Sequence, residues 1–169
     1  ERDIVSTRIK DRVFQRSLSY TYFYDTMTKS IIYDNCACQD GRGTEFARKR
    51  LLCHLQKYYR KQGTEGWVLK ADLKNFFGST SHELAYSAVT KRVNDEWVNG
   101  EIKRIIDSFN QGDDPEVGMG LGSETTQLIQ LAVLDDFDHF IKEQLHIKHY
   151  VRYNDDFIII HVDKAYLQE

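Results

Sequence analysis

The stretch His149–His161, HYVRYNDDFIIIH, decides the fold expected for the last part of the chain. Two short runs rich in β-branched and aromatic residues flank its polar centre, and such runs favour strands. Asn154 and Asp155 are turn-forming residues, so the stretch predicts a β-hairpin whose tip carries the adjacent carboxylates of Asp155 and Asp156. Like-charge repulsion makes that arrangement costly unless a cation lies beside it. Two interpretations are open here, a metal site and an ordinary surface hairpin with an acidic turn.

The chain has 169 residues, of which 41% are hydrophobic and 29% charged, and its net charge is −3. This composition is typical of a soluble globular protein, with one domain or one domain and part of another. No apolar run approaches the roughly 20 residues that a membrane span needs, so we expect no membrane partner. The chain begins at Glu1 rather than at a methionine, which suggests a fragment.

Three cysteines, Cys36, Cys38 and Cys53, cannot all pair with one another. Nothing in the sequence is typical of secretion, so we expect reduced thiols and a cytoplasmic location. A zinc site that also uses His54 is conceivable, but its spacing is poor for tetrahedral coordination, and buried free cysteines are favoured.

Charge is distributed unevenly along the chain. Residues 42–62 contain seven Lys or Arg and one acidic residue, whereas residues 107–138 contain eight acidic residues and no Lys or Arg. Such a distribution suits a protein that binds a polyanion on a basic face at its edge and metal ions at an acidic centre. The basic side of a helix predicted over residues 44–62 is either a solvated surface or a contact for a phosphate backbone.

The first third of the chain is expected to be helical and irregular. A basic helix near residues 8–18 has Ile9, Val13 and Leu18 on its apolar side. The aromatic residues between Tyr20 and Cys38 are favoured for the core, and base stacking is the alternative. From residue 67 the pattern predicts a strand, two helices, a glycine-containing loop, a long helix and the hairpin. The first of these helices starts from a capping box at Thr80 and runs to about residue 97, and the long helix spans residues 123–145.

This order predicts an α+β fold with a split β-α-β antiparallel sheet and helices on one face. In such a sheet, Asp72 at the end of the strand from residue 67 lies beside Asp155 and Asp156. Three converging carboxylates form a site for two divalent ions about 3.5 to 4 Å apart, as in polymerases and nucleases. Mg²⁺ suits such oxygen ligands, and Mn²⁺ is a possible substitute.

Two motifs now resemble those of reverse transcriptases. Tyr153-Asn154-Asp155-Asp156 matches Y-x-D-D, and the segment from Asp72 to Phe77, DLKNFF, matches D-x-x-x-F-F. STRIKDRVFQRSL and GRGTEFA are similar to fingers motifs of bacterial retroelement enzymes. The resemblance implies a right-hand polymerase, with fingers over residues 1–66 and a palm over residues 67–169 that includes some fingers elements and ends before the thumb.

The resemblance also implies residue roles. Asp72, Asp155 and Asp156 are the catalytic carboxylates and, with the Leu73 carbonyl, the metal ligands. Phe76 corresponds to an aromatic gate against a ribose 2′-hydroxyl. The remaining residues implied to contact the nucleotide are Arg2, Leu121 and Gly122, and those implied to contact the template are Gln127, Arg48 and Lys49.

The motif before the long helix departs from the common P-Q-G-x-x-x-S-P pattern. This chain has Gly120-Leu121-Gly122-Ser123-Glu124-Thr125-Thr126-Gln127, which is similar to the diversity-generating retroelement enzymes. Leu121 stands where a glutamine would touch the nucleotide, so we expect looser base selection; an unchanged misincorporation spectrum in Leu121→Gln would contradict this. Group II intron maturases and other bacterial retroelement enzymes remain alternative subclasses.

The implied activity is RNA-templated DNA synthesis by two-metal-ion nucleotidyl transfer. The implied partners are an RNA template, a DNA or RNA primer, deoxynucleoside triphosphates and an accessory retroelement protein. A chain that stops before the thumb is expected to be weakly active or inactive. The alternative is an RNA-binding, maturase-type scaffold without its own catalysis. A P-loop nucleotidase is excluded because G-x-x-x-x-G-K-[ST] does not occur.

Overall fold

The computed structural model describes residues 8–109, 114–120 and 122–168, so the nucleotide contacts predicted for Arg2 and Leu121 lie outside the described residues. The chain forms two compact units. The helical unit comprises Glu1–Ile31 and Asn75–Leu134, and the sheet unit comprises Ile32–Lys74 and Asp135–Glu169. This division by contacts cuts across the predicted boundary between fingers and palm, which stays a prediction.

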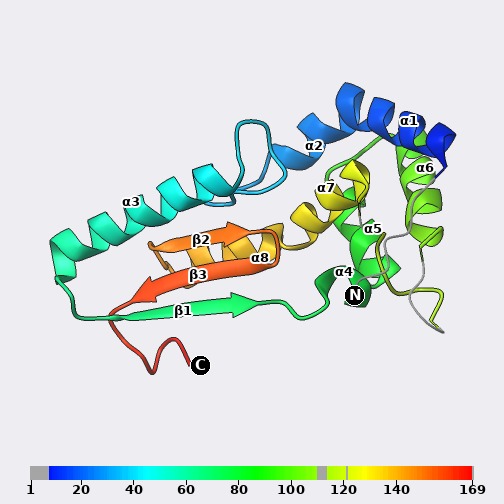
Figure 1. Ribbon diagram of the computed structural model, residues 1–169. Coiled ribbons are helices and arrows are strands. Elements are labelled where there is room, and N and C mark those ends of the chain that lie inside the picture. Colours follow the sequence, from blue (N-terminus) through cyan, green and yellow to red (C-terminus); the bar gives the residue numbers. More distant parts are fainter. Residues whose placement is uncertain (1–7, 110–113, 121, 169) are drawn as a thin grey trace. The chain divides into compact units, whose positions relative to one another are not determined.

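The sheet unit contains a small antiparallel sheet of three strands in the order β1-β3-β2. Figure 1 shows β3 between the other two strands. Both outer strands run antiparallel to β3, so β1 and β2 are parallel to each other with β3 inserted between them. The predicted α+β class and antiparallel sheet are therefore confirmed. The elements of this unit are α3 (Thr44–Gln62), β1 (Trp67–Asp72), α8 (Asp135–His139), the π-helical turn η2 (Phe140–Gln144), β2 (Tyr150–Tyr153) and β3 (Asp156–His161).

The two faces of the sheet differ because successive side chains point to opposite sides of a strand. On one face, Leu69 and Ala71 of β1 and residues of both other strands pack against α8 and η2. This core contains Ile141, Ile147, Tyr150, Phe157 and Ile159, with Phe137 of α8 against it. The opposite face carries Val68 and Lys70 of β1, both exposed.

Helix α3 has the bounds predicted from the sequence. Gly63 ends it with a φ of 68°, which glycine adopts without strain, and donates its N–H to the carbonyl of Tyr59 at 2.9 Å. The helix contacts β2. Tyr58 is 9% exposed, whereas Leu55 is 40% exposed, so only part of the predicted apolar stripe is buried.

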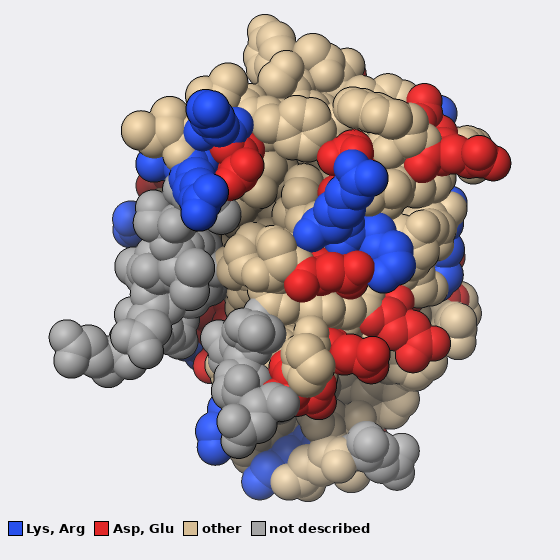
Figure 2. Space-filling view, turned by 90° about the vertical axis from the view of Figure 1, so that its right-hand side faces the viewer, with Lys and Arg blue, Asp and Glu red and all other residues tan. Residues whose placement is uncertain are grey.

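The helical unit is built around an apolar core. Ile102 and Ile106 of one helix pack with Leu128 and Ile129 of another, and each of the four is at most 1% exposed. The described elements are α1 (Ile9–Leu18), the π-helical turn η1 (Ser19–Phe23), α2 (Tyr24–Thr28), α4 (Phe76–Ser79), α5 (His82–Thr90), α6 (Glu96–Asp107) and α7 (Glu124–Val133). On the face drawn in Figure 2, Lys and Arg side chains lie among Asp and Glu side chains rather than in a patch of one sign.

Two expectations for this part of the sequence are wrong. The helix expected to run to residue 97 ends at Thr90, and its N-cap is Ser81, whose hydroxyl accepts from the backbone N–H of Leu84 at 3.2 Å. The long helix is interrupted at Leu134, between α7 and α8. The predicted apolar side of α1 is buried at Leu18, which is 7% exposed, but not at Ile9 and Val13, which are 77% and 65% exposed. No helix in the described part of the chain is long and apolar enough to cross a membrane.

Candidate metal centre

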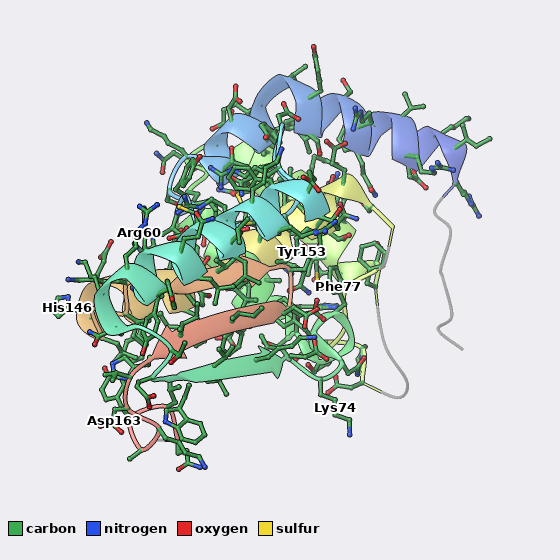
Figure 3. All side chains as sticks on the ribbon, turned by 60° about the vertical axis from the view of Figure 1, so that its left-hand side comes forward. Arg60, Lys74, Phe77, His146, Tyr153 and Asp163 are labelled. Carbon is green, nitrogen blue, oxygen red and sulfur yellow. The ribbon has the colours of Figure 1, made fainter. Side chains whose placement is uncertain are left out.

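The predicted hairpin is present. Its closing pair is Tyr153 and Asp156, which are opposite one another in the ladder between β2 and β3. The two residues between them form the turn, and Asn154 has a φ of 55°, a left-handed conformation that asparagine tolerates better than most residues. Figure 3 marks this end of the sheet with Tyr153 at the end of β2 and Lys74 beyond the end of β1.

The register of the sheet brings the third predicted carboxylate to the same end. Asp72 is the direct cross-strand partner of Asp156, and such partners have Cβ atoms about 4.5 to 5.5 Å apart on one face of the sheet. The backbone N–H of Leu73 donates to the carbonyl of Asp155 at 3.3 Å. The strand that carries Asp72 is thereby tied to the turn that carries Asp155.

All three carboxylates are open to solvent. Asp72 is exposed, and Asp155 and Asp156 are half-buried. Lys70, which precedes Asp72 by two positions and therefore shares its face, has its Nζ 3.7 Å from Oδ1 of Asp156. Both side chains are at least half exposed, and such a pair contributes only about 0 to 1 kcal/mol. The sequence prediction did not include Lys70, although its position in the strand pattern puts it on the face of Asp72.

The chemistry of these donors fits a hard divalent cation. Carboxylate and carbonyl oxygens suit Mg²⁺ and Mn²⁺, and Mg²⁺ is usually held by one or two carboxylates together with water and phosphate oxygens. Within residues 8–109, 114–120 and 122–168, no group of three or more His, Cys, Asp or Glu side chains is gathered closely enough to hold an ion.

A buried ion pair supports the hairpin from the other face of the sheet. Arg152 is 1% exposed, and its Nε and Nη2 each donate to the carboxylate of Asp138 in α8 at 2.7 Å. Its Nη1 donates to the carbonyl of Asn154 at 2.8 Å. One guanidinium thus joins the helix behind the sheet to Asn154, the turn residue that precedes Asp155. Sequence reasoning missed this residue, although a charged side chain in phase with Tyr150 in a buried strand indicates a buried partner.

Asp138 is fully buried and has further partners. The hydroxyl of Tyr150 donates to it, and Nδ2 of Asn35 donates to its Oδ2 at 3.3 Å. Burial and the neighbouring charge of Asp138 raise the pKa of Tyr150 well above its usual range, so the phenol stays protonated. A second contact to the turn comes from Cys38, whose thiol donates to Oδ1 of Asn154 at 3.3 Å.

Three residues predicted to contact nucleotide or template belong to the helical unit. Phe76 is half-buried at the start of α4, with its ring edge-on to that of Phe77. Gln127 is exposed on α7. Gly122 is exposed with a φ of 94° and lines a cavity of about 810 Å³ together with residues of α1, among them Arg12 and Arg16.

The predicted template contacts of the sheet unit lie on α3. The side chains of Arg48 and Lys49 are 83% and 73% exposed. Both approach Glu45, at 3.8 Å and 3.6 Å, which offsets part of their charge. They are accessible to a polyanion, and their role as template contacts stays a prediction.

The three cysteines are free thiols. Cys36 is fully buried and donates to the carbonyl of Asp34 at 3.4 Å. Burial, together with the charge of Asp34, raises the pKa of Cys36 to about 11, so its thiol is protonated at neutral pH and is a poor metal ligand. His54 is instead hydrogen-bonded to Asp34, at 2.8 Å.

A comparison of this chain with protein-family models and with curated protein sequences finds no match. The resemblance to reverse transcriptases therefore depends on the residues quoted above and on their arrangement in the sheet.

Proposed function

We propose that this protein is a polymerase of the reverse transcriptase type, which synthesises DNA on an RNA template by two-metal-ion nucleotidyl transfer. One observation carries the proposal. The D-x-x-x-F-F strand and the Y-x-D-D hairpin, separated by 75 residues of sequence, are neighbours in one sheet, and their acidic residues Asp72 and Asp156 are paired in register. The finer assignment to fingers and palm, with α3 in the fingers, belongs to this proposal.

The chain's own residues have distinct tasks in this mechanism. Asp72 and Asp155, with Asp156 and the Leu73 carbonyl, would hold two Mg²⁺ ions. When bound, these ions supply charge stabilisation for the primer 3′-oxygen and for the leaving pyrophosphate. Arg152 positions Asp155 through its hydrogen bond to the preceding carbonyl. The resemblance assigns exclusion of the ribose 2′-hydroxyl to Phe76.

A second candidate function is a nucleic-acid-binding scaffold without catalysis, and Lys70 favours it. Repelling carboxylates need a cation, and Lys70 already supplies one to Asp156 at 3.7 Å. A protein without bound metal therefore has a physical reason to tolerate these acids. The exposed basic residues of α3 suit RNA binding in either case.

Binding of Mn²⁺, measured by its paramagnetic relaxation of water or of backbone amides, tests the metal site without requiring turnover. We expect Asp155→Asn to weaken binding about tenfold or more, since one of few charged ligands is lost. We expect Lys70→Gln to strengthen it about twofold, because a competing cation is removed. Asp25→Asn, an exposed acid on α2, is the matched control and should leave binding unchanged.

Primer extension on an RNA template with Mg²⁺ and deoxynucleotides separates the two functions. Template-directed incorporation that Asp155→Ala abolishes supports the polymerase. Mn²⁺ binding and RNA binding without incorporation, in a protein that includes a thumb, support the scaffold. Absence of Mn²⁺ binding in the unaltered chain, or binding that Asp155→Asn does not change, contradicts the metal site itself.

A further inference from the structure

A second candidate site lies in the sheet unit, at the end of the sheet opposite the Asn154–Asp155 turn. A cavity of about 320 Å³ opens there, within the size range of small-ligand pockets. Its walls come from the last turns of α3, the segment before β2 and the end of β3: Tyr58, Lys61, Gln62, Leu145, His146, Ile147, Lys148, His149, Ile160, His161 and Val162. Figure 3 shows His146 at this end, with Arg60 of α3 near it and Tyr153 at the other end.

The polar lining of this cavity has one sign of charge. Two lysines and three histidines contribute to it, and none of the described lining residues is acidic. Lys61, Lys148 and His146 are exposed, while His149 and His161 are half-buried. Nδ1 of His161 lies 3.1 Å from the backbone nitrogen and 3.2 Å from the carbonyl oxygen of Asp163, and a protonated His161 ring donates from both of its nitrogens. Every ionisable group of the lining is therefore a donor or can become one.

A hydrogen-bonded chain connects His149 to Asp34. Asp34 can only accept, so His54 donates to it from Nε2, at 2.8 Å. Nδ1 of His54 lies 3.4 Å from Nδ1 of His149. A neutral imidazole has one donor nitrogen, so His149 can donate from both of its nitrogens only after it takes up a proton.

His54, Lys57, Tyr58 and Lys61 of α3 and Lys142 of η2 surround His149. The three lysines carry positive charge, and His54 adds to it when protonated. Burial and these positive charges lower the pKa of His149. The carboxylate of Asp34, which is connected to His149 through His54, is already compensated by Arg50 and Lys142. The cavity thus holds positive charge that no acidic side chain of its lining offsets, and an anion placed there would relieve the repulsion.

We propose that this cavity binds a phosphate group, supplied by a nucleic-acid backbone, through Lys61 and Lys148 with His149 as a third donor. The basic residues Lys57 and Arg60 continue the charge along α3, which suits a polyanion longer than one phosphate. The site shares no residue with the candidate metal centre, and it stands whether or not that centre binds metal.

Nuclear magnetic resonance titration of the whole chain tests the proposal with two probes, inorganic phosphate and a short single-stranded RNA. We expect RNA to shift the amide signals of residues 146–149 and 160–162. The double variant Lys61→Ala/Lys148→Ala should bind about tenfold more weakly. Lys10→Ala, an exposed lysine of α1 outside the cavity, should bind as the unaltered chain does.

Each outcome decides the proposal. Shifts elsewhere only, or an affinity that the double variant retains, overturns it. If inorganic phosphate binds as tightly as RNA does for each phosphate group, the cavity is a phosphate site. Its assignment to nucleic acid is then overturned. Retention of RNA binding at this site in Asp155→Asn distinguishes it from the candidate metal centre.

The proton on His149 provides a separate readout. RNA phosphodiesters keep a single charge between about pH 8 and 5, whereas inorganic phosphate changes charge in that range. The pKa of His149, followed by its ring resonances, should rise when RNA is added, and RNA should therefore bind more tightly as the pH falls. His149→Gln should lose that part of the pH dependence. An unchanged pKa in the presence of bound RNA overturns the role of His149.

Discussion

The helical unit and the sheet unit bury different kinds of side chain. In the described part of the helical unit, the buried polar residues are neutral amides and hydroxyls with one histidine, His82. The sheet unit instead buries full charges, at Asp34, Asp135, Asp138 and Arg152. Buried ion pairs add little net stability over an apolar core, because desolvation offsets their attraction. Their contribution here is to fix the position of one element relative to another. Arg152 joins α8 to Asn154, the turn residue that precedes Asp155.

This difference predicts unequal responses to substitution, and the chain carries a reporter in each unit. Its two tryptophans are Trp67 in β1 and Trp97 in α6. The variants Trp97→Phe and Trp67→Phe therefore give single-tryptophan proteins. Denaturant unfolding followed by fluorescence then reports the sheet unit and the helical unit separately.

The largest effect is expected from breaking the buried ion pair. Arg152→Leu leaves Asp138 charged and buried, and we expect a loss of about 3 to 5 kcal/mol in the free energy of unfolding reported by Trp67. Asp138→Asn together with Arg152→Leu removes both charges of this pair and should recover part of that loss. Lys103→Ala, which removes an exposed pair with Asp107, should change stability by less than about 0.5 kcal/mol. A small effect of Arg152→Leu would show that solvent reaches this pair.

A somewhat smaller effect is expected in the apolar core of the helical unit. Ile129 on α7 is fully buried, and Ile129→Ala should cost about 2 to 4 kcal/mol in the transition reported by Trp97. Ile129→Val, which removes a single methylene, should cost about 1 kcal/mol. If the alanine variant cost no more than the valine variant, the core would be loosely packed and the contrast between the units would fail.

The smallest effect near neutral pH is expected from acid titration of the sheet unit. His149, with its lowered pKa, favours the folded state above the unfolded pKa of about 6.5, and this contribution fades as the pH falls. Burial alone would raise the pKa of Asp34, but hydrogen bonds from His54, Lys142 and Arg50 lower it well below its usual range. Its contribution is therefore complete above about pH 4 and lost in stronger acid.

Stability measured by Trp67 should thus decline slightly between about pH 7 and 5 and steeply below about pH 4. The stability reported by Trp97 should fall less below about pH 4, since the described buried groups of the helical unit include no carboxylate. Identical acid profiles for both tryptophans would contradict the contrast drawn from the buried charges.

The ends of helices and the turn of the hairpin were predicted correctly where a single residue type has a strong conformational preference. Gly63 ends α3 because glycine adopts a positive φ freely, and Asn154 turns the hairpin for a related reason. The N-cap of α5 lies one residue later than predicted because Ser81, next to Thr80, supplies the same kind of hydroxyl. Exposure was harder to predict. Phe23 is fully buried as expected for the core, whereas Tyr20 is 83% exposed.

The sequence by itself determined the hairpin, α3, the strand from Trp67 and the positions of the three aspartates along the chain, because propensity and turn chemistry act over a few residues. Only the tertiary structure decided that Asp72 pairs with Asp156, that Lys70 reaches the same carboxylate and that Arg152 is buried against Asp138. Strand register and buried partners depend on contacts between residues far apart in the chain. Periodicity within one segment does not specify such contacts.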